Sequence, residues 1–117
     1  MAAMEIKTED YRICYDPSTT TVSFVGSLRL SGPAEYAPIV QLLGSIASVE
    51  PAKITLNLQQ LEFLNSSGIN MLSKFIIDVR KKARVQMAVQ GSQGIAWQGK
   101  SLKNLQRLMP GLQLELV

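Results

Sequence analysis

Two adjacent serines, Ser66 and Ser67, are the side chains of this sequence with the clearest potential chemistry. They stand in the run Asn65-Ser66-Ser67-Gly68, directly before a segment with helical periodicity. The first turn of a helix leaves backbone N–H groups without intrahelical partners, and these groups and the helix dipole favour an anion. A phosphate on either serine would lie in a favourable field and add about −1.5 to −2 charges to the surrounding surface. Regulated phosphorylation is therefore one interpretation of this run.

The other interpretation is an unmodified helix start. Asn65 or Ser66 can cap a backbone N–H group through a side-chain oxygen. Gly68 has no Cβ, so we expect that a partner or a nucleotide can approach the helix closely at this point. Such runs are common at helix starts, and the four residues alone leave both interpretations open.

The composition argues against most other chemistry. The 117 residues contain no histidine, which removes the Ser-His-Asp triad, the Cys-His pair and imidazole metal ligands. The single cysteine, Cys14, cannot form an internal disulfide, and its place in an alternating segment predicts a small core residue. The acids Glu9, Asp10 and Asp16 lack metal-ligand spacing. We therefore expect no catalytic residue, no metal and no cofactor, and we predict that the protein is not an enzyme.

The segment after the serines has the period of a helix that ends near Lys82. At about 100° per residue, one side of this helix is apolar and is predicted to face the core: Ile69, Leu72, Phe75, Ile76 and Val79. The opposite side carries Asn70, Lys74, Ile77, Asp78 and Lys81. Ile77 is an apolar residue on a polar side. It is either a scattered exposed residue or a contact point beside the serines.

Around this segment, hydrophobic periodicity predicts the other elements. Strands at 11–16 and 21–31 form an antiparallel hairpin, with Gly26 as a β-bulge. A helix at 34–48 turns Tyr36, Ile39, Val40 and Leu43 toward the core. The remaining elements are a strand at 53–58, a connection at 59–64, a strand at 84–90, a helix at 99–109 and a strand at 112–117. No regular element is predicted in residues 1–10, which can be a flexible N-terminus. The order implies one α/β domain over 1–117, with a mixed β-sheet and helices packed on it.

The charge is distributed unevenly along the chain. Residues 66–117 contain eight Lys/Arg against two Asp/Glu, whereas residues 1–65 contain four against seven. The densest basic run is Arg80-Lys81-Lys82 with Arg84, and no aromatic residues are interleaved with it. We therefore expect no nucleic-acid partner. No segment reaches the roughly 20 apolar residues that cross a bilayer, and no signal peptide is evident, so we expect no membrane partner and a cytoplasmic location.

The segment from Ile54 to Ile69, an apolar strand and short connection leading to Asn65-Ser66-Ser67-Gly68, resembles the signature of the STAS domain. This is the fold of bacterial anti-sigma-factor antagonists, whose motif reads Asp-Ser-Ser-Gly-Leu at a helix N-terminus. The element order over about 11–117 agrees with the family. The motif differs at Asn65, which replaces the aspartate. Asn keeps the capping oxygen but loses the charge, and this could slow or abolish phosphorylation.

The resemblance implies that Ser66 is the phosphoacceptor, with Ser67 as the second choice. It implies a partner-switching serine kinase or anti-sigma factor as partner, and a phosphatase that resets the switch. The implied partner-binding residues lie on the loop and the helix that follows: Asn65, Ser66, Asn70, Ser73, Lys74 and Ile77. A switch of this kind is expected to be a monomer or a weak dimer.

Two alternatives stay open at this point. The chain could be a constitutive, non-phosphorylated STAS scaffold in a larger signalling assembly, which the change at Asn65 makes plausible. An apolar ligand bound between the sheet and the helices is the second alternative.

Overall fold

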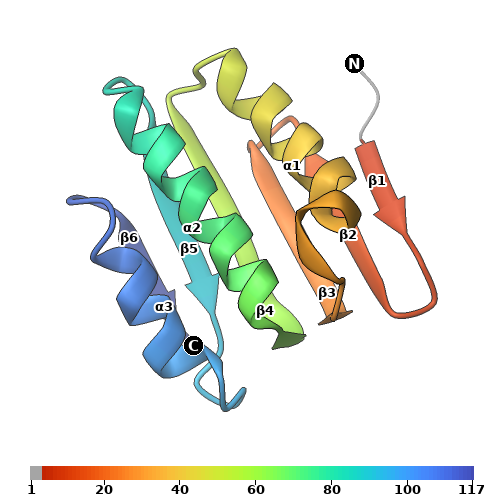
Figure 1. The fold of residues 1–117 in the computed structure, drawn as a ribbon. Coiled ribbons are helices and arrows are strands. Elements are labelled where there is room, and N and C mark those ends of the chain that lie inside the picture. Colours follow the sequence, from red (N-terminus) through yellow and green to blue (C-terminus); the bar gives the residue numbers. More distant parts are fainter. Residues whose placement is uncertain (1–3) are drawn as a thin grey trace.

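The computed structural model describes residues 4–117, which form a six-stranded sheet with three helices (Figure 1). The strands are β1 (Met4–Lys7), β2 (Tyr11–Asp16), β3 (Thr21–Leu28), β4 (Lys53–Leu64), β5 (Gln86–Gly91) and β6 (Gln113–Leu116). The helices are α1 (Gly32–Ser48), α2 (Ser66–Lys81) and α3 (Gln98–Gln106). The predicted α/β domain with a mixed sheet is confirmed.

The strands lie in the sheet in the same order as in the chain. The pairs β1–β2 and β2–β3 are antiparallel, and the pairs β3–β4, β4–β5 and β5–β6 are parallel. Successive right-handed crossovers that advance in one direction place every helix on one face. In the described part of the chain, α1, α2 and α3 accordingly lie side by side on that face, and the opposite face carries no helix (Figure 1).

The N-terminal prediction was wrong for residues 4–7, which form β1 rather than a flexible segment. The strand is only four residues long, and Glu5 and Lys7 alternate with a single partly buried apolar residue, Ile6. That is too short a pattern for its period to be recognised. Residues 1–3 lie outside the described part.

The prediction for Cys14 was also wrong. The alternation in β2 is real, but its buried member is Ile13. Cys14 therefore lies on the helix-free face, where its thiol donates to Glu5 Oε2 at 3.2 Å and accepts from Arg12 Nε at 3.0 Å. A cysteine fits either side of a strand, so its type did not decide which face is buried.

The predicted connection at 59–64 belongs to β4. Alternation breaks at Gln59-Gln60 because β3 and β4 shift register there, at irregularities between Ser23 and Val25 and between Gly26 and Ser27. Gly26 borders the second irregularity with a φ of 99°, but the residue without a pairing partner there is Glu62 of β4. The bulge expected at Gly26 of β3 therefore lies on the neighbouring strand. β4 runs beyond its pairing with β5, which ends at Asn57.

The loop before α3 covers this unpaired part of β4. The Trp97 indole donates to the Leu61 carbonyl at 3.0 Å, and the fully buried Gln98 amide donates to the carbonyls of Leu58 and Leu61. Side chains thus satisfy backbone acceptors that a neighbouring strand would otherwise pair.

The core lies between the sheet and the helices. Four of the five residues predicted to face it from α2 are buried, and Ile69 is partly buried. In α1, Tyr36, Ile39 and Leu43 are buried as predicted, but Val40 is 49% exposed. Val40 lies at the margin of the apolar stripe, where the wheel alone does not separate the core from the surface.

Candidate functional site

The N-terminus of α2 is organised by the side chain of Asn65. Its Oδ1 accepts hydrogen bonds from the Gly68 backbone N–H at 2.9 Å and from the Tyr36 hydroxyl at 2.7 Å. Its Nδ2 donates to the Leu30 carbonyl at 2.8 Å. Asn65 is thus the N-cap of α2, as one interpretation of the sequence allowed, and it also ties the start of α2 to the segment before α1.

This arrangement gives a physical reason for asparagine in place of the aspartate in the motif that the sequence resembles. Among the described residues, the amide of Asn65 is the one hydrogen-bond donor to the partly buried Leu30 carbonyl. An ionised carboxylate would direct a second oxygen at that carbonyl and leave it unpaired. The other two bonds, from Gly68 N–H and from Tyr36, would tolerate either side chain.

Tyr36 completes the network from α1. It is 1% exposed, and its hydroxyl also lies 3.4 Å from the Leu28 carbonyl. Burial raises the pKa of the Tyr36 phenol, so the group stays protonated and keeps donating to Asn65. The helical period of α1 predicted only that Tyr36 lies in the core. Its role at the start of α2 depends on contact between residues 29 positions apart.

Gly68 does not serve the close approach of a partner, as we had expected. It is buried, and a Cβ at this position would lie 2.2 Å from Leu64 Cδ1 and 2.7 Å from the Tyr36 hydroxyl. Glycine is therefore required by packing inside the protein. That part of the prediction is wrong, because the missing side chain would point inward.

Ser66 and Ser67 face outward from the same turn. Ser66 is exposed and Ser67 is half-buried. Among the described residues, no hydrogen bond engages either hydroxyl or either backbone N–H, whereas Gly68 and Ile69 both donate to Asn65. The first two N–H groups of α2 are thus free to meet an anion, and the Ser66 hydroxyl is accessible to an enzyme.

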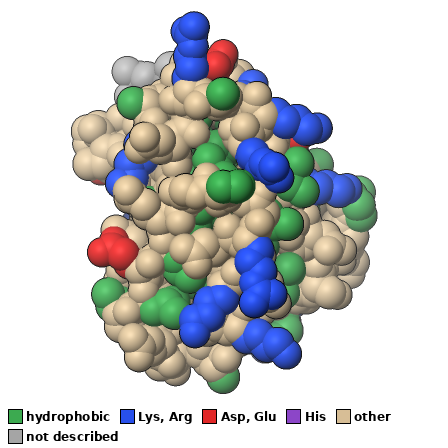
Figure 2. Space-filling view, turned by 90° about the vertical axis from the view of Figure 1, so that its left-hand side faces the viewer, with side chains coloured by type: hydrophobic (Ala, Val, Ile, Leu, Met, Phe, Trp, Pro, Cys, Tyr) green, Lys and Arg blue, Asp and Glu red, His purple; other side chains and the backbone are tan. Residues whose placement is uncertain are grey.

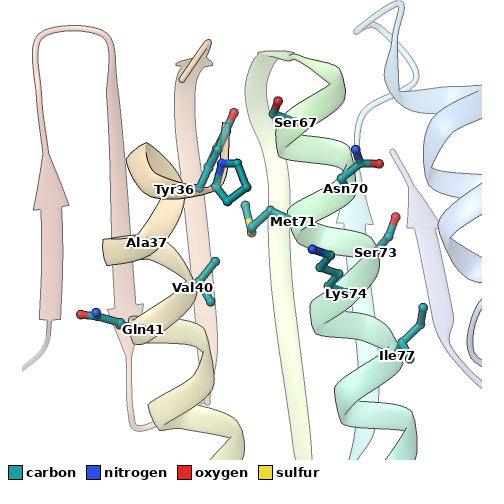
Figure 3. A pocket seen from close by; sticks show the side chains of 11 residues that line it. Tyr36, Ala37, Val40, Gln41, Ser67, Asn70, Met71, Ser73, Lys74 and Ile77 are labelled. Carbon is teal, nitrogen blue, oxygen red and sulfur yellow. The ribbon is translucent and has the colours of Figure 1, made fainter. Parts of the chain in front are cut away.

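A groove of about 600 Å³ runs between α1 and α2 beside this turn. Figure 3 shows its lining side chains, with Met71 and Lys74 extending from α2 toward α1. The α1 wall consists of Pro33, Tyr36, Ala37, Val40 and Gln41, and the α2 wall of Ser67, Asn70, Met71, Ser73, Lys74 and Ile77. Apolar side chains therefore form much of its surface next to the two serines.

The groove brings together four of the six predicted partner-binding residues: Asn70, Ser73, Lys74 and Ile77. The Ser73 hydroxyl is already bonded to the Ile69 carbonyl at 2.8 Å. Ser66 lies outside the lining. Asn65 has its amide occupied within the fold, so its side chain is a poor candidate for direct partner contact. The α1 wall was not predicted from the sequence, where Val40 was assigned to the core although it is exposed.

Basic side chains are concentrated on one edge of the molecule. Figure 2, which views the molecule from the side of α3 and β6, shows several Lys and Arg side chains on that edge and few acidic ones. The exposed basic residues of α2, α3 and the adjoining loops are Lys74, Arg80, Lys81, Arg84, Lys100, Lys103 and Arg107. Within residues 4–117 the one salt bridge joins Arg12 to Glu5, on the helix-free face, so none of these basic residues is paired.

Two further properties concern cofactors and membranes. The described residues contain no group of three or more His, Cys, Asp or Glu side chains placed to hold a metal ion. None of the helices in residues 4–117 has the length and apolarity needed to traverse a bilayer.

No protein-family model matches the sequence, and no curated protein is significantly similar to it. Solved structures share its fold. SiaC of Pseudomonas aeruginosa superposes with a TM-score of 0.73 at 13% identity, covering 100% of both chains. The structure of the diguanylate cyclase SiaD in complex with its activator SiaC, also from Pseudomonas aeruginosa, gives a TM-score of 0.74 at 12% identity, over 97% of this chain and 99% of that one.

An anti-sigma factor antagonist from Mycobacterium paratuberculosis superposes with a TM-score of 0.58 at 18% identity, over 96% of this chain and 84% of that one. At such identities the likeness concerns the fold. The predicted resemblance to the STAS-like fold of anti-sigma-factor antagonists is confirmed at that level.

Proposed function

We propose that this protein is a regulatory interaction module that binds a protein partner through the N-terminus of α2 and the adjacent groove, under control of phosphorylation at Ser66. The observation that carries the proposal is that the residues of the first turn of α2 have separate structural roles. Asn65 and Gly68 hold the turn from inside, while the Ser66 hydroxyl is exposed beside an open groove. Ser67 is the second choice of acceptor.

The partner in this proposal is a switch serine kinase or an anti-sigma factor, with a phosphatase that resets the switch in the cytoplasm. A phosphate on Ser66 would be stabilised by the free N–H groups of the first turn and by the helix dipole. It would also place about −1.5 to −2 charges beside Ser67, which lines one end of the groove. Binding of the unmodified form and release of the phosphorylated form follow from this change in charge and bulk. The chain itself would be a substrate rather than an enzyme.

A second candidate is a constitutive scaffold or activator that is never phosphorylated. Asn65 favours it, because the family's aspartate is missing and its replacement is committed to the Leu30 carbonyl. The likeness to SiaC, described as the activator of a diguanylate cyclase, supports widening the class of partner from kinases to other signalling enzymes. In that case the groove is occupied permanently and Ser66 is a surface residue.

The test is mass spectrometry of the protein isolated from its own cells during growth and during stress. Fragmentation separates a phosphate on Ser66 from one on Ser67, and a Ser66→Ala variant provides the control. A condition-dependent phosphate on Ser66 that disappears in the variant is the expected result. A chain that stays unmodified in every condition would reject phosphorylation control and favour the scaffold.

A further inference from the structure

The groove between α1 and α2 has an unusual wall. Residues 36–49, which make up most of α1 and its C-cap, contain no charged side chain. The part of this wall that lines the groove includes Val40 at 49% exposure and the small Ala37, and its exposed polar member is the uncharged Gln41. Ile77 adds an apolar side chain at 36% exposure from α2. Isolated exposed apolar residues need no explanation, but Val40 and Ile77 line the same groove.

The backbone around the groove decides what kind of chain can enter it. Both walls are helices, whose interior N–H and C=O groups are already paired. An extended peptide would therefore bring its own backbone groups into an apolar groove and find few partners for them. A helix satisfies its backbone internally and can present an apolar stripe to Val40, Met71 and Ile77. The geometry therefore favours a helix over a strand.

The charge around the groove indicates which charge the partner helix carries beside its apolar stripe. Among residues 4–117, Lys74 is the one charged residue that lines the groove, and its side chain extends over it (Figure 3). Within the same described part of the chain, neither Lys74 nor the neighbouring exposed bases of α2 and α3 form a salt bridge. Charges that are left unpaired on one side of a docking surface select an oppositely charged partner.

From these observations we infer that the partner presents an amphipathic α-helix whose apolar stripe enters the α1–α2 groove and whose acidic flank lies against Lys74 and the α2 side. This inference rests on the proposed function, because it describes the partner of the same site. It adds the secondary structure, the polarity and the charge of the partner segment. It also assigns α1 to the binding surface, with Ala37 and Val40 as contact residues.

The probe is a pair of synthetic amphipathic peptides of about 18 residues, about 27 Å long as helices. Their Leu/Ala apolar stripes are identical, and one flank carries Glu in the first peptide and Lys in the second. Each is titrated into the isotope-labelled, unphosphorylated protein while backbone resonances are followed by NMR. The Glu peptide should shift the resonances of Ala37, Val40, Met71 and Ile77, and should bind about tenfold or more tightly than the Lys peptide.

Substitutions assign the effect to the groove. Lys74→Glu should weaken binding of the Glu peptide about three- to tenfold, the range expected for reversing one exposed charge. Lys7→Glu makes the same change in charge on β1, at the far edge of the sheet, and should leave binding unchanged. Val40→Ala should weaken both peptides without affecting the fold, because its side chain is half exposed.

Three results would overturn the inference. Equal affinity for the two peptides would contradict the inferred acidic flank of the partner helix. Resonance shifts confined to residues outside the groove would contradict the groove as the docking site. Groove resonances that move with protein concentration alone would identify a second copy of this chain as the occupant. The titration uses no kinase and no phosphate. An absence of phosphate on Ser66 in cells would therefore refute the proposed switch without affecting this result, and the converse also holds.

Discussion

The run Asn65-Ser66-Ser67-Gly68 has an inner pair and an outer pair that differ in almost every physical respect. Asn65 and Gly68 face inward. The amide of the first makes three hydrogen bonds, and the second occupies a place in which no Cβ fits. Ser66 and Ser67 face outward and leave both their hydroxyls and their N–H groups unbonded within the described structure.

The difference shows how a short motif can serve folding and regulation at once. The inner pair fixes the start of α2 against Tyr36 and Leu30, so the position of the outer pair does not depend on a partner. The outer pair can then change its charge without a cost in packing. Substitutions in the inner pair should therefore lower the stability of the fold, whereas substitutions in the outer pair should have little effect on it.

Gly68→Ala should cause the largest loss. The added methyl group would overlap Leu64 and the Tyr36 hydroxyl, both buried, and overpacking of this kind costs about 1–3 kcal/mol. Gly44→Ala is the matched control, because a Cβ there meets nothing within 4 Å. It should raise stability by up to about 1 kcal/mol through helix propensity. Urea unfolding measures both. A Gly68→Ala protein as stable as the unmodified one would show that the inner pair is not fixed by packing.

Asn65→Asp should have the next largest effect, a loss of about 1–3 kcal/mol near neutral pH. The carboxylate keeps the hydrogen bonds from Gly68 N–H and Tyr36, but its second oxygen cannot donate to the Leu30 carbonyl and repels it. The deficit should narrow at low pH, because a protonated carboxyl can again donate to that carbonyl.

Ser66→Asp adds the same charge one residue further along, on the outer side and near the positive end of the helix dipole. It should cost little or nothing. Thermal unfolding at several pH values compares the two variants. Equal losses for both would mean that added charge at the turn, and not the Leu30 carbonyl, explains the absence of aspartate.

Much of the fold was predictable from the sequence, because its signals are local. The hairpin, the bounds of α2 and the capping role of Asn65 depend on period and residue type within one segment. The bonds of Asn65 to Leu30 and Tyr36 could not be predicted, because these partners are 35 and 29 residues away. The inward direction of Gly68 was missed because it depends on how Leu64 and Tyr36 pack around it. The α1 wall was missed for a similar reason. Whether Val40 is buried depends on how closely α2 approaches.

The smallest expected effect lies on the helix-free face, where Glu5 forms an exposed cluster with Cys14 and Arg12. The bond from the Cys14 thiol, and secondarily the charge of Arg12, lower the pKa of the Glu5 carboxyl. A carboxyl whose pKa is lowered in the folded state stabilises the protein at pH values above its pKa in the unfolded state. This contribution disappears as the pH falls through the pKa of the folded state.

NMR titration of Glu5 should therefore give a pKa below the ordinary value of a glutamate carboxyl, and Cys14→Ala and Arg12→Gln should each raise it. The change in stability should be slight and confined to acidic pH, since the pair is about half exposed and screened by water. A larger loss than that of Asn65→Asp would reverse the ranking. It would mean that outward-facing polar groups in this protein hold the fold as firmly as the inner pair does, and that the outward position of Ser66 is no sign of freedom to be modified.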